Sequence, residues 1–289
     1  MAEKICYCKI YMSKNGEKIN MGTNEVTILG ARGSLPVSGA GFTVYGGATA
    51  CVLLETEDAA IVFDAGTGLL SLPERVWKTH KTTHVMISHL HLDHLLGIPM
   101  SQMLYDPQAE VVFYAADADA CEKAIRQFMQ PPLWPVGPES FGAKITYRSI
   151  GQGSFAIPDI SVTMRAMSVC HPGGCLVYRA DWDGGSIVYA TDCELDEVGS
   201  RELMAFAEGA GLMLLDAQYT EREYDKCRGF GHNDLRTAVT VLAESSVERG
   251  LLYHHAPTRT DAELIDIERR IQQAYPQISM AREGDTLKL

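Results

Sequence analysis

The chain has 289 residues, of which 46% are hydrophobic and 21% are charged, and its formal net charge at pH 7 is -12. This composition is typical of a folded protein with its own core, and it excludes a disordered or a membrane-embedded chain. It also disfavours a basic surface for general nucleic-acid binding, although a phosphorylated small molecule is not excluded as a substrate.

The amino-terminal residues 1–24 are predicted to be an extension, because the first clear strand begins at Glu25. This extension has no apolar stretch followed by a cleavage site, and the eight cysteines of the chain are irregularly spaced. Both features predict reduced thiols and a cytoplasmic location. We expect residues 25–289 to form one domain.

Hydrophobic periodicity divides the rest of the chain into strands and helices. Short apolar runs predict strands at residues 25–30, 50–55, 60–63, 85–88, 110–114, 144–149, 161–167, 176–180, 186–189, 212–215 and 251–253. Helical spacing predicts helices at residues 93–104, 117–128, 200–207, 233–244 and 260–275. Asn233 is expected to cap the helix at 233–244, and Thr260 with Glu263 forms a capping box. This order of elements predicts a layered α/β sandwich.

The segment 88–94 carries the strongest chemical signal, because it places His89, His91, Asp93 and His94 within a few residues. Imidazole and carboxylate groups are ligands of divalent transition metals. A predicted apolar strand precedes the segment, so these side chains stand at the mouth of a buried element, where unpaired charge is costly. The segment therefore predicts a metal site rather than a solvated loop.

Further metal-ligand candidates follow other predicted strands. His171 follows the strand at 161–167, Asp192 follows the strand at 186–189, and His254 and His255 follow the strand at 251–253. Each of these residues alone is more typical of a capped or solvated side chain. Their joint appearance after strands that open on the same sheet edge favours a shared binuclear site.

The chain also has FDAGTG at residues 63–68 and a Thr-Asp pair at 191–192. Together with segment 89–94, His171 and the final histidine, these motifs follow the order found in the metallo-β-lactamase fold superfamily, which the chain resembles over about residues 25–289. The resemblance implies a four-layer αββα sandwich with two divalent metal ions, Zn²⁺ first, with Mn²⁺ or iron as alternatives. It also implies two metal sites that share Asp192, with His89, His91 and His171 at one and Asp93, His94 and His254 at the other.

Two assignments within this set have alternatives. His254 is preferred to His255 because it leads a His-x-x-Pro turn like that of the superfamily's phosphodiesterase branch, and His255 is then expected behind the ligands. Many relatives have aspartate where this chain has Ala256. Asp64 resembles the aspartate that accepts a hydrogen bond from a ligand imidazole, and the alternative is a turn-forming aspartate before Gly66.

The segments 214–220 and 229–233 are similar to the phosphodiesterase branch, which includes tRNA 3' processing endonucleases and small cyclic phosphate phosphodiesterases. By that resemblance Asp216 orients His232, which either donates a proton to the leaving alkoxide or stabilises the phosphorane. The alternative makes His232 a simple helix-start residue. Residues 121–144 are proline-rich and lightly charged, so they offer no basic arm of the kind that the tRNA-processing enzymes carry.

The predicted function is hydrolysis of a small phosphodiester, a cyclic one included, by a hydroxide that bridges the two metals. Asp93, Asp216 and His232 are the predicted catalytic residues. A thioester or lactone hydrolase with a structural His232 is the second hypothesis, and an inactive metal-binding sensor is the third. The expected partner is a small-molecule phosphodiester and no membrane, while a nucleic-acid substrate is disfavoured but stays open. Analogy with related phosphodiesterases makes a homodimer plausible.

Overall fold

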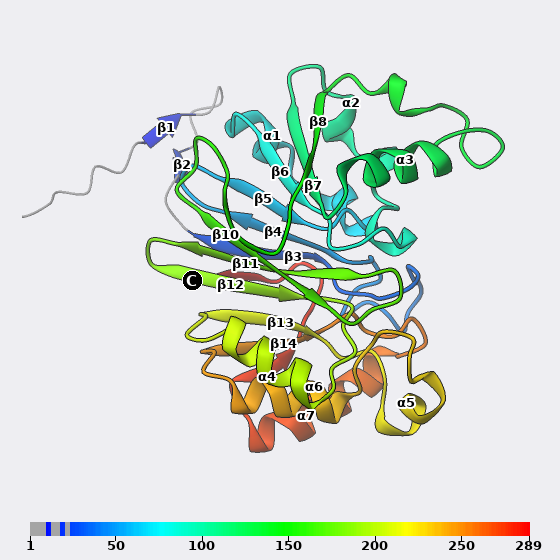
Figure 1. Ribbon diagram of the computed structural model, residues 1–289, viewed down its shortest axis with the longest axis vertical. Coiled ribbons are helices and arrows are strands. Elements are labelled where there is room, and N and C mark those ends of the chain that lie inside the picture. Colours follow the sequence, from blue (N-terminus) through cyan, green and yellow to red (C-terminus); the bar gives the residue numbers. More distant parts are fainter. Residues whose placement is uncertain (1–9, 13–17, 21–23) are drawn as a thin grey trace, which may run out of the picture.

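The computed structural model describes residues 10–12, 18–20 and 24–289. Two mixed sheets of seven strands each pack face to face, and helices cover the outer surface of both sheets (Figure 1). The predicted four-layer αββα sandwich is confirmed. Among the described residues, no helix is both long and apolar enough to cross a membrane.

The first sheet has the strand order β16-β3-β4-β5-β6-β7-β8. In chain order its strands are β3 (Glu25–Gly30), β4 (Cys51–Glu55), β5 (Ala60–Phe63), β6 (Thr83–Met86), β7 (Glu110–Ala115), β8 (Lys144–Ser149) and β16 (Thr286–Lys288). Strands β5 to β8 are parallel. Their carboxyl ends therefore lie at one edge of the sheet.

The second sheet has the order β15-β14-β13-β12-β11-β10-β9. Its strands are β9 (Gly153–Ala156), β10 (Thr163–Val169), β11 (Cys175–Trp182), β12 (Gly185–Ala190), β13 (Leu212–Asp216), β14 (Arg249–Tyr253) and β15 (Ile278–Met280). Strands β12 to β15 are parallel, and β10 runs in the same direction because β11 is antiparallel to both β10 and β12. Their carboxyl ends also share one edge.

Helices α1 (Glu74–Thr79), α2 (Gln102–Tyr105) and α3 (Ala118–Phe128) pack on the first sheet. Helices α4 (Glu197–Phe206), α6 (Leu235–Glu244) and α7 (Asp261–Ala274) pack on the second sheet, and α5 (Glu221–Cys227) lies at one end of their layer (Figure 1). The predicted capping box of Thr260 and Glu263 starts α7.

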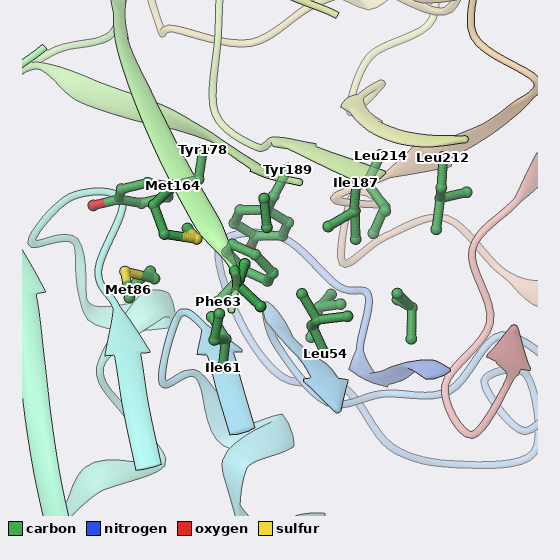
Figure 2. Close-up of a cluster of buried hydrophobic side chains, with 14 of the residues drawn as sticks. Leu54, Ile61, Phe63, Met86, Met164, Tyr178, Ile187, Tyr189, Leu212 and Leu214 are labelled. Atoms are coloured by element: carbon green, nitrogen blue, oxygen red, sulfur yellow. The ribbon is translucent and has the colours of Figure 1, made fainter. Parts of the chain in front are cut away.

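The main core lies between the sheets, where Phe63 and Ile61 of β5 face Tyr189 and Ile187 of β12 (Figure 2). The rings of Phe63 and Tyr189 are stacked with their centroids 5.3 Å apart. Every residue of β5 is buried, because Ile61 and Phe63 face the other sheet and their neighbours face the helices. Burial on both faces explains why this strand reads as a continuous apolar run.

The predicted helix at residues 93–104 is wrong. The chain instead forms the short 3-10 turns Leu92–His94 and Ile98–Met100, followed by α2. Pro99 has no backbone N–H and disfavours a helical conformation in the residue before it. Gly97 also donates its N–H to the Ala65 carbonyl at 2.9 Å, which holds the segment against the loop after β5.

The cap predicted at Asn233 is also wrong, because Asp234 caps α6 and accepts hydrogen bonds from the N–H groups of Arg236 and Thr237. Asn233 instead uses its side chain to join two loops: it accepts from Leu195 N at 2.9 Å and donates to the Asp216 carbonyl at 3.3 Å. Adjacent Asn and Asp are both good caps, so the sequence could not choose between them.

Within the predicted extension, β1 (Ile10–Met12) and β2 (Lys18–Asn20) pair with each other in a two-stranded antiparallel sheet. Strand β3, which enters the first large sheet, begins at Glu25. The boundary between an extension and the main domain stays a prediction.

Replacing Phe63 by alanine should destabilise the protein by about 3–5 kcal/mol, because it removes a fully buried ring from between the sheets. Chemical denaturation followed by circular dichroism measures this change. Leu133→Ala is the control: Leu133 is 70% exposed, so its loss should change the free energy of unfolding by no more than about 0.5 kcal/mol. A Phe63→Ala effect as small as that of the control would contradict the assigned core.

Candidate metal centre

All seven predicted metal ligands lie together where the carboxyl ends of the strands from both sheets meet. The histidines and aspartate of segment 89–94 follow β6, His171 follows β10, Asp192 follows β12 and His254 follows β14. These side chains come from segments far apart in the sequence. The direction of the strands brings them to one edge.

The first group consists of His89, His91, His171 and Asp192, whose ligand atoms all lie within 4.8 Å of one another. His171 Nε2 is 3.1 Å from His91 Nδ1, and His89 Nε2 is 3.6 Å from Asp192 Oδ2. His91 is exposed and the other three are buried. The group is therefore open to solvent on one side.

The second group consists of Asp93, His94, Asp192 and His254, all buried, with ligand atoms within 4.8 Å of one another. His254 Nε2 lies 3.2 Å from Asp93 Oδ2 and 3.1 Å from Asp192 Oδ1. His94 Nε2 lies 3.2 Å from the same oxygen of Asp192. Asp192 thus belongs to both groups and turns a different oxygen to each.

The polar atoms of this cluster fit divalent cations. His89 Nε2 and His94 Nε2 are buried and have no hydrogen-bond partner, which is costly unless another group binds them. His94 donates its Nδ1–H to Asp64 at 2.7 Å and His171 donates its Nδ1–H to the Gly231 carbonyl at 2.8 Å. In both rings the lone pair of Nε2 then faces the cluster, as a metal ligand requires.

Four non-glycine residues at the site have left-handed backbone angles. The φ values are 62° at Ser34, 59° at Asp64, 45° at Asp192 and 60° at His254. Such residues are uncommon, and they persist where the surrounding structure compels them, often at functional sites. The N–H of Ser34 donates to Asp93 Oδ2 at 2.7 Å, so one of these turns holds a candidate ligand.

Asp64 lies directly beneath the cluster and is fully buried. Its carboxylate accepts hydrogen bonds from the Ser88 N–H and hydroxyl at 2.7 and 2.8 Å, from the Tyr189 hydroxyl at 2.9 Å and from His94. The contacts match the predicted role of a carboxylate that orients a ligand imidazole. A turn-forming aspartate would not need the bonds to His94 and Tyr189.

His255 lies outside every candidate metal group among the described residues. Its Nε2–H donates to the Ala281 carbonyl at 2.8 Å, and burial lowers the pKa of its ring to about 3, so the ring is neutral. His254, the preferred residue of the pair, is the one whose side chain lies in the cluster.

His232 and Asp216 form a buried pair beside the second group. His232 donates its Nδ1–H to Asp216 Oδ2 at 2.7 Å, and its ring stacks on that of His254 with centroids 5.0 Å apart. Burial alone would lower the pKa of His232, but the charge of Asp216 and the hydrogen bond to it raise the pKa to about 9. Asp216 therefore favours the protonated form of the ring.

Glu194 supports the site and was not predicted from the sequence. Its carboxylate accepts hydrogen bonds from the N–H groups of Gly229 and Gly231 at 2.8 and 2.9 Å, and from the Tyr224 hydroxyl at 2.8 Å. The loop it holds carries both His232 and the Gly231 carbonyl that binds His171. Its position two residues after Asp192 is the only local signal, and that spacing is not distinctive.

Residues 59–255 match the beta-lactamase superfamily domain, which is more than half of the chain. The chain belongs to this superfamily. The "Probable metallo-hydrolase YhfI" of Bacillus subtilis (strain 168) is 22% identical to it over 243 residues, which cover 80% of this chain and 86% of the relative. Ribonuclease Z of Bradyrhizobium sp. (strain ORS 278) is 23% identical over 282 residues, which cover 82% of this chain and 92% of the relative.

Solved structures have the same fold as this superfamily member. The crystal structure of YhfI from Bacillus subtilis has a TM-score of 0.70 at 17% identity and covers 93% of this chain and 100% of that one. A diphosphatase of the PhnP family has a TM-score of 0.68 at 17% identity, with coverages of 92% and 97%. These likenesses establish the metallo-β-lactamase fold.

Asp64→Asn should weaken metal binding about 10- to 100-fold. The carboxylate of Asp64 accepts four hydrogen bonds, whereas an amide has one accepting oxygen and a nitrogen that can only donate. Mass spectrometry measures the metal content, which we expect to be two ions per chain in the unaltered protein. Competition with a chromophoric chelator measures the metal affinity of each variant. Asp119→Asn, an exposed carboxylate on α3, is the control. Equal affinities in the two variants would contradict the role of Asp64.

Proposed function

We propose that this superfamily member is a dinuclear, metal-dependent phosphodiesterase that hydrolyses a small phosphodiester. The observation that carries the proposal is the His232–Asp216 pair, whose imidazole Nδ1 lies 2.7 Å from Asp216 and 3.9 Å from the shared Asp192. Because Nδ1 is bound to Asp216, Nε2 is the atom available to give a proton to a leaving group.

The choice of phosphorus over thioester chemistry rests on what a proton donor is needed for. An alkoxide that leaves phosphorus is a strong base and needs a proton as the bond breaks. A thiolate is a much weaker base, with a conjugate-acid pKa of about 8.5 for a cysteine-like thiol, and departs without one. An imidazole that Asp216 positions as a proton donor therefore favours the phosphodiester.

The proposed metal ligands are His89, His91 and His171 for one ion and Asp93, His94 and His254 for the other, with Asp192 shared. Nitrogen and oxygen donors of this kind suit zinc, and also manganese and iron. Two such ions, when bound, would supply the Lewis-acid chemistry that activates water and neutralises charge on a phosphate.

The remaining groups act by holding those side chains in place. Asp64 fixes the ring of His94, the Gly231 carbonyl fixes the ring of His171, and Asp216 fixes the ring of His232. Because the cluster is buried except at His91, water and substrate must approach from that side.

The names of the relatives agree with this choice. A ribonuclease Z and a PhnP-family diphosphatase are both named for hydrolysis at phosphorus. They support phosphorus chemistry for this chain, while the small-molecule substrate is proposed from its own residues.

His232→Ala should slow hydrolysis more as the leaving group becomes more basic. We expect little loss with p-nitrophenolate from bis-p-nitrophenyl phosphate, and a loss of about 10²- to 10⁴-fold in kcat with an alkoxide leaving group, because only the latter needs the proton. Steady-state kinetics across a series of leaving groups, with the metal-loaded protein, measure this dependence.

Asp93→Ala should abolish turnover of every ester in that series. His80→Gln is the control: His80 precedes β6, at the opposite end of the strand from the cluster, so this variant should keep its turnover. If His232→Ala lowers kcat equally for all leaving groups, His232 is not the general acid. Turnover of thioesters with no turnover of phosphodiesters would overturn the proposed function.

Glu194→Ala should lower kcat for the alkoxide-releasing ester by about 10-fold or more, because a small displacement of His232 misplaces the proton. KM should change much less, since Glu194 does not face the substrate. Glu194→Gln keeps an acceptor and should restore part of the rate. Glu202→Gln is the control, because Glu202 is a carboxylate that lines the same surface cavity as Glu194. A Glu194→Ala effect confined to KM would contradict a positioning role.

A further inference from the structure

A cavity of about 450 Å³ lies beside the first group of metal-ligand candidates and has no role in the function proposed so far. It is lined by the carboxyl ends of β6 and β7, the start of α3, the turn at residues 172–174 and the start of β11. His89 and His91 both line it. The cavity and the first group therefore have these two residues in common.

The lining of the cavity is mainly apolar. Ile87, Leu90, Pro172 and Leu176 supply hydrocarbon surface, and several alanines and glycines keep the interior wide. Apolar surface of this kind stabilises an apolar occupant by removing both surfaces from water.

Charged groups are scarce in the lining. Among the described residues around the cavity no lysine or arginine occurs, and Asp117 is the one carboxylate. Asp117 caps α3 by accepting a hydrogen bond from Ala120 N at 3.0 Å. Burial raises the pKa of the Cys175 thiol well above its usual value, so this group is neutral. The lining itself therefore offers an anionic occupant no basic side chain and presents the carboxylate of Asp117.

The volume suits a flat ring system. Ligand pockets in proteins are about 300–1,000 Å³, and a cavity of about 150 Å³ holds benzene. A bicyclic aromatic group therefore fits this space with its linker directed at His89 and His91.

Two exposed apolar residues are sequence neighbours of residues in or behind the cluster. Leu92, between His91 and Asp93, is 54% exposed, and Phe230, next to the Gly231 that binds His171, is 60% exposed. Solvent-exposed apolar side chains near a polar cluster can contribute to binding, because a substrate with apolar surface would remove them from water.

We infer that this cavity binds an uncharged aromatic ester arm of the phosphodiester whose phosphate lies at the metal centre. The inference rests on the proposed phosphodiesterase function and names the class of its substrate. The cavity selects an aromatic arm by apolar contact and rejects an arm that carries a second phosphate or a carboxylate.

A set of p-nitrophenyl phosphodiesters tests the inference, with methyl, benzyl, 2-naphthylmethyl and 4-carboxybenzyl groups as the second arm. Each arm joins the phosphate through one CH₂ or CH₃ carbon, so the intrinsic reactivities are similar. With the metal-loaded protein, kcat/KM should rise about 10- to 100-fold from the methyl to the 2-naphthylmethyl ester. The 4-carboxybenzyl ester should fall back to the level of the methyl ester.

Filling the cavity should remove this preference. Ala120→Phe on α3 and Ala116→Phe just before it both place a ring in the cavity, and each should lower the ratio of the 2-naphthylmethyl to the methyl kcat/KM by at least about 10-fold. Ala118→Phe makes the same substitution on α3 at a position outside the lining and should keep the ratio of the unaltered protein.

The outcomes separate the two proposals. If the metal-loaded protein hydrolyses none of the esters, the phosphodiesterase function falls. If it hydrolyses all of them with no preference for the aromatic arm, the cavity is not the binding site for that arm while the function stands. A preference that persists in both filled variants would also overturn the assignment, and if neither variant folds, the ester series in the unaltered protein still decides it.

Discussion

The carboxylate of Asp192 is the group on which the site depends, because it is a buried negative charge between two sets of histidines. Its Oδ2 lies 3.6 Å from His89 and 3.8 Å from His171, while its Oδ1 lies 3.2 Å from His94 and 3.1 Å from His254. A buried carboxylate is costly unless positive charge compensates it. The proposed pair of cations would meet that requirement, and a left-handed turn at the end of β12 sets the position of the carboxylate.

The packing of the two sheets is joined to this site through Tyr189. Its ring stacks on Phe63 in the core between the sheets, and its hydroxyl donates to Asp64, which in turn accepts from His94. The same side chain thus contributes to stability and to the orientation of a candidate ligand. Glu194 acts comparably on the other side, because one carboxylate holds the loop that orients both His171 and His232.

The chemistry and the selectivity belong to different parts of the structure. The clustered histidines and aspartates favour hydrolysis in general, the His232–Asp216 pair favours an alkoxide leaving group, and the apolar cavity beside His89 and His91 favours an uncharged arm. The overall charge of -12 is compatible with an anionic substrate because two bound cations would dominate the local field.

Hydrophobic periodicity determined most strands and long helices, and the local motif at 89–94 showed that the chain holds metal-ligand types, because both signals are contained within short segments. The periodicity did not predict the short elements β9, β15, β16, α1 and α5, and it wrongly predicted one continuous helix at residues 93–104.

Only the tertiary structure decided that the side chain of His254, and not that of His255, lies in the cluster. It also gave Asp64 its hydrogen-bond partners, which are 24, 30 and 125 residues away in the sequence. It alone placed Glu194 on the loop of His232 and left an apolar cavity beside the cluster. The physical reason is that hydrogen-bond partners and cavity walls come from separate strand ends, whose meeting is decided by how the two sheets pack.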